Sequence, residues 1–244
     1  MSDSNKPHFV FPKWTNKIVK VILIGAVLLP IYVVLLLYYG ANARTLNVGY
    51  EPVQPVPYSH ALHAGTLGIN CEYCHTDVAR AAFAALPPTQ TCMNCHTAIA
   101  PKSRKLQLVR DSYGTGNPKL AGMPIPWKKV NALPDYVYFN HAAHVNAGIS
   151  CLVCHGHVNE MTRVYQARPL NMAWCLACHR NPAPYLRPRN EVTNLSWTPK
   201  NKTRLARDLG LSVAKLPKNL GKYLMARYHI PGKKILTDCE TCHR

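Results

Sequence analysis

Hydrophobic residues are distributed unevenly along the chain. An uncharged run rich in valine, leucine and isoleucine extends from Val21 to Ala43, and it is long enough to cross a bilayer as one helix. Lysines are frequent before this run, whereas a single arginine, Arg44, follows it closely. By the positive-inside rule, this pattern predicts a cytoplasmic tail over residues 1–17 and a transmembrane anchor over residues 18–43, with the remaining chain on the outer side of the membrane.

A cleaved signal peptide is the alternative to this anchor, because such a peptide also begins with a basic tail and an apolar run. The sequence Ala41-Asn42-Ala43 resembles the small-residue site at which signal peptides are cut. The apolar run is nevertheless longer than the roughly 7–15 apolar residues of a usual signal peptide. We therefore favour an anchor that is retained, with its helix over residues 18–39.

The rest of the chain favours short elements. The sequence contains twenty prolines and thirteen glycines, which stop long regular elements from forming. One amphipathic helix is predicted from about Lys202 to Lys215, where Pro217 would stop it. The expected fold is one transmembrane helix followed by short helices and irregular chain, with little or no β-sheet.

An internal repeat organises the part of the chain after the anchor. The segment Tyr58–His75 reappears, with one residue deleted, as the segment Phe139–His155. Each copy ends in a C-x-x-C-H sequence and is followed by a second one, so the repeating unit contains two of them. We expect a first module with a basic linker over residues 44–134, a second module over residues 135–180, and a C-terminal segment with one further C-x-x-C-H over residues 181–244.

Five C-x-x-C-H sequences, called the first to fifth motifs in chain order, account for all ten cysteines. Two cysteines at this spacing can form thioethers with both vinyl groups of one porphyrin, and the following histidine then lies under the ring as an iron ligand. The sequence therefore predicts five covalently bound haem c groups. The motif residues are Cys71, Cys74 and His75; Cys92, Cys95 and His96; Cys151, Cys154 and His155; Cys175, Cys178 and His179; and Cys239, Cys242 and His243.

Other chemistry for these cysteines is less well supported. A structural zinc site takes C-x-x-C sequences in pairs, and five is an odd number. A disulfide framework would not place a histidine after every second cysteine. Thioredoxin-like C-x-x-C sequences occur singly, near a βαβ pattern that this sequence lacks.

Five haems would leave about 49 residues for each, so the porphyrins themselves are expected to form the core around which the chain wraps. The side chains give a formal net charge of +18. Haem propionates would offset about ten of these charges, which makes acidic or membrane-surface partners better supported than nucleic acid. We expect no nucleic-acid binding.

Each repeat also contains an H-x-x-H sequence just before its first motif. His60 and His63 form the first pair, and His141 and His144 form the second. Residues three apart share one face of a helix, so both rings of a pair can point toward iron. Because haem iron with one histidine has a free sixth position, these four residues are predicted to be its distal ligands.

This arrangement resembles that of small multihaem cytochromes of the c3/c7 type, in which aromatic-x-His-x-x-His precedes C-x-x-C-H. In that family the first histidine ligates the haem of the motif just after it, and the second histidine reaches another haem. The pairs that the resemblance implies here are His60 with His75, His141 with His155, His63 with His96, and His144 with His179.

The fifth motif has no H-x-x-H before it, so the sixth ligand of its haem is open. Met172 lies just before the fourth motif, and in c7-type proteins a ligand in such a place serves a different haem. His229 lies ten residues before Cys239, and Met161 and His157 are further candidates. We place Met172 first and His229 second; His8, in the predicted cytoplasmic tail, is not expected to be a ligand.

The whole chain also resembles the pentahaem subunit of alternative complex III, a bacterial quinol oxidoreductase. The resemblance rests on the N-terminal anchor, the 2+2+1 layout of the motifs and the strings PPTQTCMNCH, PIPWKKVNALPDYVYFNHAAH and PLNMAWCLACHR, and it covers nearly all of residues 18–244. It implies three kinds of partner: integral membrane subunits that bind quinol, a peripheral iron–sulfur subunit and a mono-haem cytochrome c. It also implies a place in the cytoplasmic membrane of a bacterium, with the haem domain on the periplasmic side.

The implied function is electron transfer from a quinol-oxidising membrane complex to a periplasmic acceptor such as a cytochrome c. Stand-alone quinol dehydrogenases carry a haem motif close to the end of their helix, whereas about 30 residues separate Tyr39 from Cys71 here. A multihaem reductase needs an iron with an open position, and the supply of histidines argues against one. No catalytic residue is predicted, because no cysteine remains as a nucleophile and the chain contains only eleven Asp and Glu residues in total.

Overall fold

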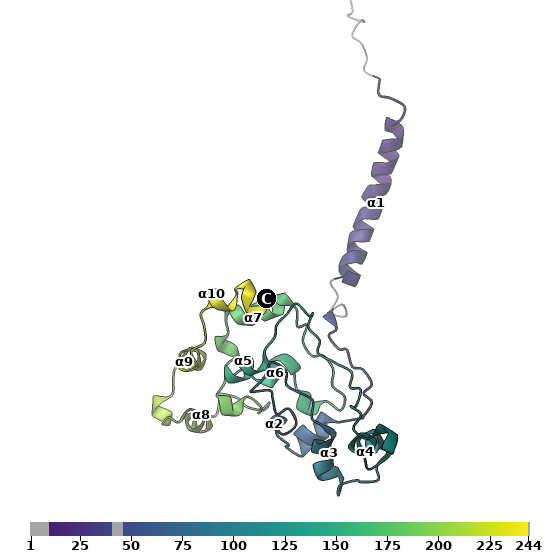
Figure 1. Cartoon of the computed structure of the whole chain (residues 1–244). Helices are drawn as coiled ribbons and strands as arrows, with labels where there is room; N and C mark the ends of the chain where they lie inside the picture. The colour runs from purple at the N-terminus through teal and green to yellow at the C-terminus, as the bar shows by residue number, and fades with distance from the viewer. Residues whose placement is uncertain (1–9, 41–45, 244) are drawn as a thin grey trace, which may run out of the picture. The chain divides into compact units, whose positions relative to one another are not determined.

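The structure, a computed structural model, describes residues 10–40 and 46–243. The chain divides into two compact units, residues 1–46 and residues 47–244. Figure 1 shows one long helix in the first unit, and short helices joined by irregular chain in the second.

The long helix, α1, extends over Thr15–Gly40 and continues through Pro30. Its apolar part has a mean hydropathy of 2.8, and none of its described side chains is buried. By length and composition α1 can cross a membrane, although a signal sequence near an N-terminus has the same properties. The predicted N-terminal apolar helix is therefore present and begins three residues earlier than expected, while the candidate cleavage sequence at 41–43 lies outside the described residues.

The second unit is built from short helices, as the prolines and glycines predicted. Its α-helices and its π- and 3₁₀-helical turns (labelled η) are η2 Ala61–Thr66, α2 Cys71–Cys74, α3 Thr89–His96, η3 Arg104–Leu106, α4 Gln107–Tyr113, η4 Pro118–Leu120, α5 His141–Asn146, α6 Cys151–His155, η5 Val158–Glu160, α7 Met172–Arg180, η6 Ala183–Tyr185, η7 Arg189–Glu191, α8 Lys202–Leu209, η8 Val213–Lys215, α9 Leu220–Arg227, α10 Lys233–Leu236 and α11 Cys239–Cys242.

Within residues 10–40 and 46–243 no strand is present, which agrees with the predicted helical class. The nearest approach to a sheet is one antiparallel bridge between Ile149 and Leu186. The helix predicted from Lys202 to Lys215 is shorter than expected. Gly210 ends α8 in a left-handed conformation with φ +67°, and its N–H bonds the carbonyls of Ala206 and Arg207.

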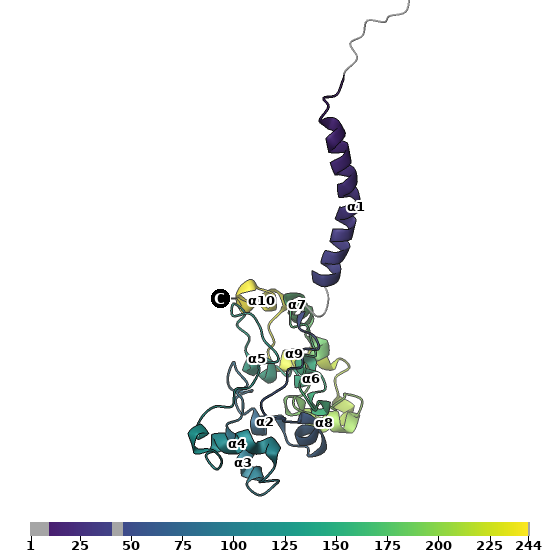
Figure 2. The same ribbon diagram turned by 90° about the vertical axis from the view of Figure 1, so that its right-hand side faces the viewer.

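Apolar side chains are buried in two small clusters. One is formed by Val56, Met93 and Val109, where α3 packs against α4. The other is formed by Ile149 with four leucines of the C-terminal segment, Leu186, Leu205, Leu209 and Leu224. Figures 1 and 2 both place α3 and α4 at one end of this unit and α7 and α10 at the opposite end, with α2, α5 and α6 between them.

Candidate functional site

The first, third and fifth motifs are held by the same local structure. In each, the first cysteine opens a short helix, and the preceding residue caps that helix with a side-chain oxygen. Asn70 accepts from the Glu72 N–H at 2.9 Å, Ser150 from the Leu152 N–H at 3.3 Å, and Asp238 from the Glu240 N–H at 3.0 Å. The cap fixes where the helix begins and therefore where both cysteines of the motif point.

The second and fourth motifs lie instead at the ends of longer helices. The second closes α3, whose first residue follows Pro88, and the fourth lies in the last turns of α7, which Asn171 caps. The structure thus distinguishes two kinds of motif, and the fifth motif belongs to the kind that opens each repeat. The sequence signal that distinguishes the first kind is the Asn, Ser or Asp directly before the first cysteine.

The two H-x-x-H pairs have nearly the same geometry in both repeats. Tyr58 stacks on His63 with ring centroids 4.4 Å apart, and it meets His60 edge-on at 4.8 Å. In the second repeat Phe139 stacks on His144 at 4.5 Å and meets His141 edge-on at 4.7 Å. The aromatic residue at the start of each repeat therefore orients both imidazoles.

Most of the predicted iron ligands share one kind of hydrogen-bond partner. In seven of them Nδ1 lies 2.8–3.1 Å from a backbone carbonyl oxygen. A carbonyl only accepts, so these rings carry their proton on Nδ1 and present Nε2 as the ligating atom, as metal-bound histidines do. The pairs are His63 with Ser59, His75 with Ala85, His96 with Ile99, His141 with Ala82, His144 with Asn140, His179 with Leu236, and His243 with Tyr136.

Two further rings depart from this pattern. Nδ1 of His155 lies 3.2 Å from Nδ2 of Asn131, while Oδ1 of the same amide is buried without a hydrogen-bond partner among the described residues. Exchanging the amide nitrogen and oxygen satisfies Oδ1 and makes Nδ1 of His155 a donor as well. Nδ1 of His60 is buried and has no partner within the described chain.

The structure places the rings of two of the four implied histidine pairs close together. A metal–imidazole bond is about 2.0 Å long, so two rings on opposite sides of one metal have centroids about 6 Å apart. The centroid distance is 6.2 Å between His63 and His96, and 6.0 Å between His144 and His179. The separations fit two ligands of one iron in each repeat.

The other two pairs are electrostatic neighbours. Burial, followed by the positive charges of His75, His63 and His155, lowers the pKa of His60 to about 4. Burial, followed by the charges of His141 and His75, lowers the pKa of His155 to about 4. Both rings are thus neutral near pH 7, which is the form that binds a metal.

Contacts between motifs give them an order in space that differs from their order in the chain. The second motif contacts the first, because Nδ2 of Asn94 donates to the Tyr73 hydroxyl at 3.3 Å. The first contacts the third, because Cys71 accepts a hydrogen bond from Cys151, which lowers the pKa of Cys71 to about 7 and raises that of Cys151.

The remaining motifs continue this row. The third and fourth are joined by His144, which lies in the helix before the third motif and faces His179 of the fourth. The fourth and fifth are joined where α7 packs against α10 and the Leu236 carbonyl accepts from Nδ1 of His179. The spatial order of the motifs is therefore second, first, third, fourth and fifth.

A turn that sequence analysis did not single out covers the junction of the first and third motifs. The Thr193 carbonyl lies 4.0 Å from Sγ of Cys71, and the Thr193 hydroxyl accepts from Asn70 at 3.4 Å. The neighbouring Val192 carbonyl accepts from the buried Ser150 hydroxyl at 2.9 Å. One turn thus contacts both Asn70 and Cys71 at the first motif and Ser150, which precedes the third motif.

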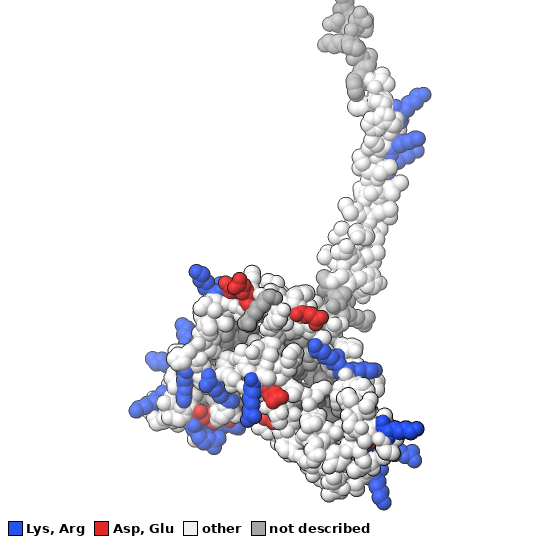
Figure 3. Space-filling model, in the orientation of Figure 1, with Lys and Arg blue, Asp and Glu red and all other residues white. Residues whose placement is uncertain are grey.

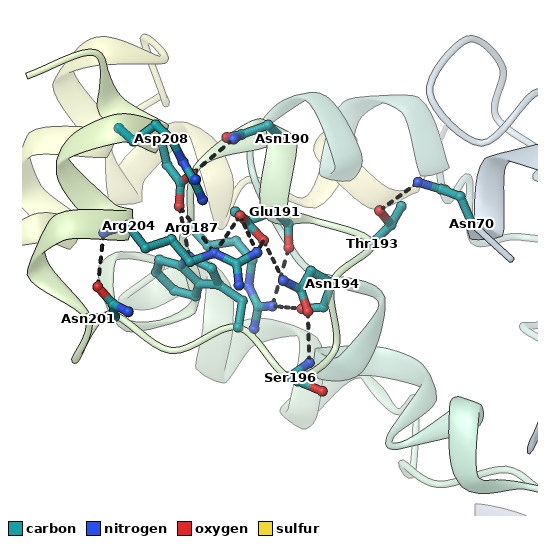
Figure 4. A network of polar contacts seen from close by, with 12 residues as sticks. Asn70, Arg187, Asn190, Glu191, Thr193, Asn194, Ser196, Asn201, Arg204 and Asp208 are labelled. Carbon is teal, nitrogen blue, oxygen red and sulfur yellow. Dashed lines mark hydrogen bonds and ion pairs between the residues drawn. The ribbon is translucent and has the colours of Figure 1, made fainter. Parts of the chain in front are cut away.

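A partly buried ion pair holds this turn in place (Figure 4). Glu191 is 5% exposed and accepts three hydrogen bonds from Arg204, at 2.7–3.0 Å, and one from Asn194 at 2.6 Å. Arg187 donates to the Asn194 carbonyl at 2.8 Å. No sequence motif marks these residues, because the pair joins positions thirteen apart across a bend.

The four candidates for the sixth ligand of the fifth haem lie in different surroundings. Met172 is the first residue of α7, the helix that packs against α10, and its side chain is 63% exposed. His229 is exposed and has a positive φ of 52°. Met161 is buried in the protein, and Nδ1 of His157 lies 3.6 Å from the Glu160 carboxylate.

The residues of the motifs fit covalent haem. Each motif supplies two free thiols at the end or beginning of a helix and one imidazole. In four of the five motifs that imidazole has Nδ1 bound to a carbonyl and Nε2 available. The donor set is therefore the one that a c-type haem requires.

Comparison with known proteins gives one informative likeness. No model of a known protein family matches the chain. The chain is 26% identical over 149 residues to the multihaem cytochrome c subunit of menaquinone reductase from Nitratidesulfovibrio vulgaris, and the match covers 52% of this chain and 68% of that protein. The chain is thus similar to a multihaem c-type cytochrome from a menaquinone enzyme, and a multihaem c-type cytochrome is what the C-x-x-C-H motifs predict.

Proposed function

We propose that this chain is a membrane-anchored electron-transfer subunit with five covalent haems, which passes electrons from a quinol-oxidising membrane complex to a periplasmic acceptor such as a cytochrome c. The observation that carries the proposal is the pairing of imidazoles about 6 Å apart in both repeats, each with Nδ1 on a carbonyl. The similarity to a subunit of a menaquinone enzyme and the apolar helix α1 support the membrane setting.

In this proposal the chain binds and orients the haems, and does no bond-making chemistry on a substrate. The thiols of each motif would hold a haem as thioethers, and the histidine of the same motif would ligate its iron through Nε2. A haem held in this way supplies a one-electron iron couple. Backbone carbonyls accept the Nδ1 protons of these rings, which would keep Nε2 available to ligate iron.

The distal histidines decide between electron transfer and catalysis. With His60, His63, His141 and His144 as sixth ligands, four irons have no position for a substrate. Met172 is proposed for the fifth iron, and His229 is the second choice. The proposed partners are integral quinol-binding subunits, an iron–sulfur subunit and a mono-haem cytochrome c. The proposed location of the haem domain is the periplasmic side of a bacterial cytoplasmic membrane.

The opposite direction of electron flow is the second candidate. The protein that this chain resembles is named a menaquinone reductase, so in that enzyme electrons enter the quinone. The same row of motifs would serve either direction, because electron transfer between fixed sites is reversible and the potentials of donor and acceptor decide it.

Purification of the native complex tests the proposal. We expect five haems per chain by pyridine haemochrome assay, co-purification of integral membrane subunits, and no rapid carbon monoxide binding to the reduced protein. Reduction by a menaquinol analogue supports the first direction, and reduction of the quinone by reduced protein supports the second. Four or fewer haems in mature protein, or rapid carbon monoxide binding, would contradict the proposal.

A further inference from the structure

The row of motifs has two ends, and the second motif forms one of them. The second motif contacts the first through Asn94 and Tyr73, and His96 faces His63, which lies just before the first motif. Figures 1 and 2 agree in placing α3, which contains this motif, at one end of the unit of residues 47–244. A redox partner in solution can therefore approach the row here without displacing another motif.

The second motif is covered by little protein at this end. Cys95 is exposed, and Ile99, whose N–H bonds the Cys95 carbonyl at 2.8 Å, has a side chain that is 63% exposed. The carbonyl of the same residue accepts from Nδ1 of His96 at 2.9 Å. The exposed apolar residue Ile99 is thus hydrogen-bonded, through its backbone, to two residues of the motif.

The chain after Ile99 is basic and firmly held. Lys102, Arg104 and Lys105 are exposed. Arg110 fixes the segment that carries them, because its guanidinium donates to the carbonyls of Pro101 and Ser103, both at 2.8 Å. Three cations are therefore presented beside an apolar residue on a segment that is tied down.

No exposed acid offsets these cations within the surrounding sequence. Between Val78 and Pro134 Asp111 is the single acidic residue, and it is 8% exposed and accepts from Gln107 and the Asn117 N–H. Figure 3 accordingly shows blue side chains along the edge where α3 and α4 lie, with almost no red. The eight basic residues of this stretch are Arg80, Lys102, Arg104, Lys105, Arg110, Lys119, Lys128 and Lys129.

The opposite end of the row differs in charge. The fifth motif contains Glu240 and follows Asp238, and His243 donates to the carbonyl of Tyr136, the residue after Asp135. Two acidic residues, Asp238 and Glu240, thus follow Lys233 and Lys234 within a few residues. A partner that is selected by charge would distinguish the two ends.

We propose that the surface formed by Ile99, Lys102, Arg104 and Lys105 is the docking site of a small acidic redox protein, and that electrons cross the protein boundary at the second motif. This inference rests on the proposed electron-transfer function. A small apolar centre with a charged rim suits a transient partner, because the rim charges speed encounter and the small contact area allows rapid release.

Charge reversal tests the proposal with a matched control. In the purified full-length holoprotein, Lys102→Glu, Arg104→Glu and Lys105→Glu are combined in one variant. The control combines Lys215→Glu, Lys218→Glu and Lys222→Glu, which changes net charge equally at exposed positions near α9. The probe is a plant-type ferredoxin, a small acidic iron–sulfur protein, and its dissociation constant is measured by calorimetry at about 20 mM and about 200 mM salt.

The docking-site variant should raise the dissociation constant at least about tenfold at low salt, and the control less than about threefold. Carbodiimide, which joins carboxylates to lysines in direct contact, should cross-link the probe to Lys102 or Lys105. Equal weakening by both variants, cross-links that fall mainly on the control lysines, or no measurable binding would overturn the proposal. A low haem count with binding intact would instead contradict the electron-transfer function, so the two failures are distinguishable.

Discussion

Replacing Arg204 by alanine should destabilise the turn that covers the first and third motifs. Glu191 is 5% exposed, and the substitution removes three of its hydrogen bonds, which leaves Asn194 as its described donor. Removing one partner of a buried ion pair costs about 3–5 kcal/mol, whereas exposed pairs contribute less than about 1 kcal/mol. Because the Arg204 side chain is 40% exposed, we expect a loss of about 2 kcal/mol in the free energy of unfolding.

Urea unfolding of the holoprotein, followed by far-ultraviolet circular dichroism, measures this loss. Arg207→Ala is the control, because that guanidinium is 75% exposed and lies 3.9 Å from Asp208, and the change should cost less than about 0.5 kcal/mol. Adding Glu191→Gln to Arg204→Ala should restore about 1 kcal/mol, since the unpaired charge is then gone. If Arg204→Ala costs no more than the control, the ion pair does not hold the turn.

Three further substitutions test the sites individually. Ser150→Ala should lower the free energy of unfolding by about 1–3 kcal/mol, because it removes a helix cap and leaves the buried Val192 carbonyl without its donor; a loss below about 0.5 kcal/mol would contradict this. His144→Met should raise the potential of one haem in a redox titration, because thioether ligation favours ferrous iron, and an unchanged titration would remove His144 as a ligand. Met172→Ala should open the sixth position of the fifth haem, so that this haem binds carbon monoxide when reduced. Absence of binding together with an unchanged spectrum would transfer the assignment to His229.

Local patterns in the sequence predicted what depends on neighbouring residues. The apolar run predicted α1, and the prolines and glycines predicted short helices, because hydropathy and backbone restriction act over a few residues. The aromatic residue and two histidines of each repeat also act locally, and the structure gives them matching ring geometry in both copies. The predicted end of the helix at Lys215 was wrong. The prediction extended the helix past Gly210, a residue that favours a helix end and that terminates α8 in the structure.

The arrangement of the motifs was beyond sequence reasoning. The contact of Cys71 with Cys151 joins residues eighty positions apart, and no local pattern reports on such a contact. The same holds for Thr193, which lies against Cys71 although nothing in its own surroundings distinguishes it from an ordinary turn residue. Spacing along the chain predicts which residues can bind a cofactor, whereas tertiary packing decides which cofactors become neighbours.

The carbonyl partners of the imidazoles also have a consequence for the assembly of the protein. His63 and His144 bond carbonyls four residues earlier, so their tautomer is selected as soon as one turn of chain has formed. His179 depends on Leu236, 57 residues later, and His243 depends on Tyr136, 107 residues earlier. Closing loops of this length is slow and costs entropy before any contact stabilises them. The fourth motif is thus complete in sequence at residue 179, yet its ring takes up its final orientation only after Leu236, in α10, has docked.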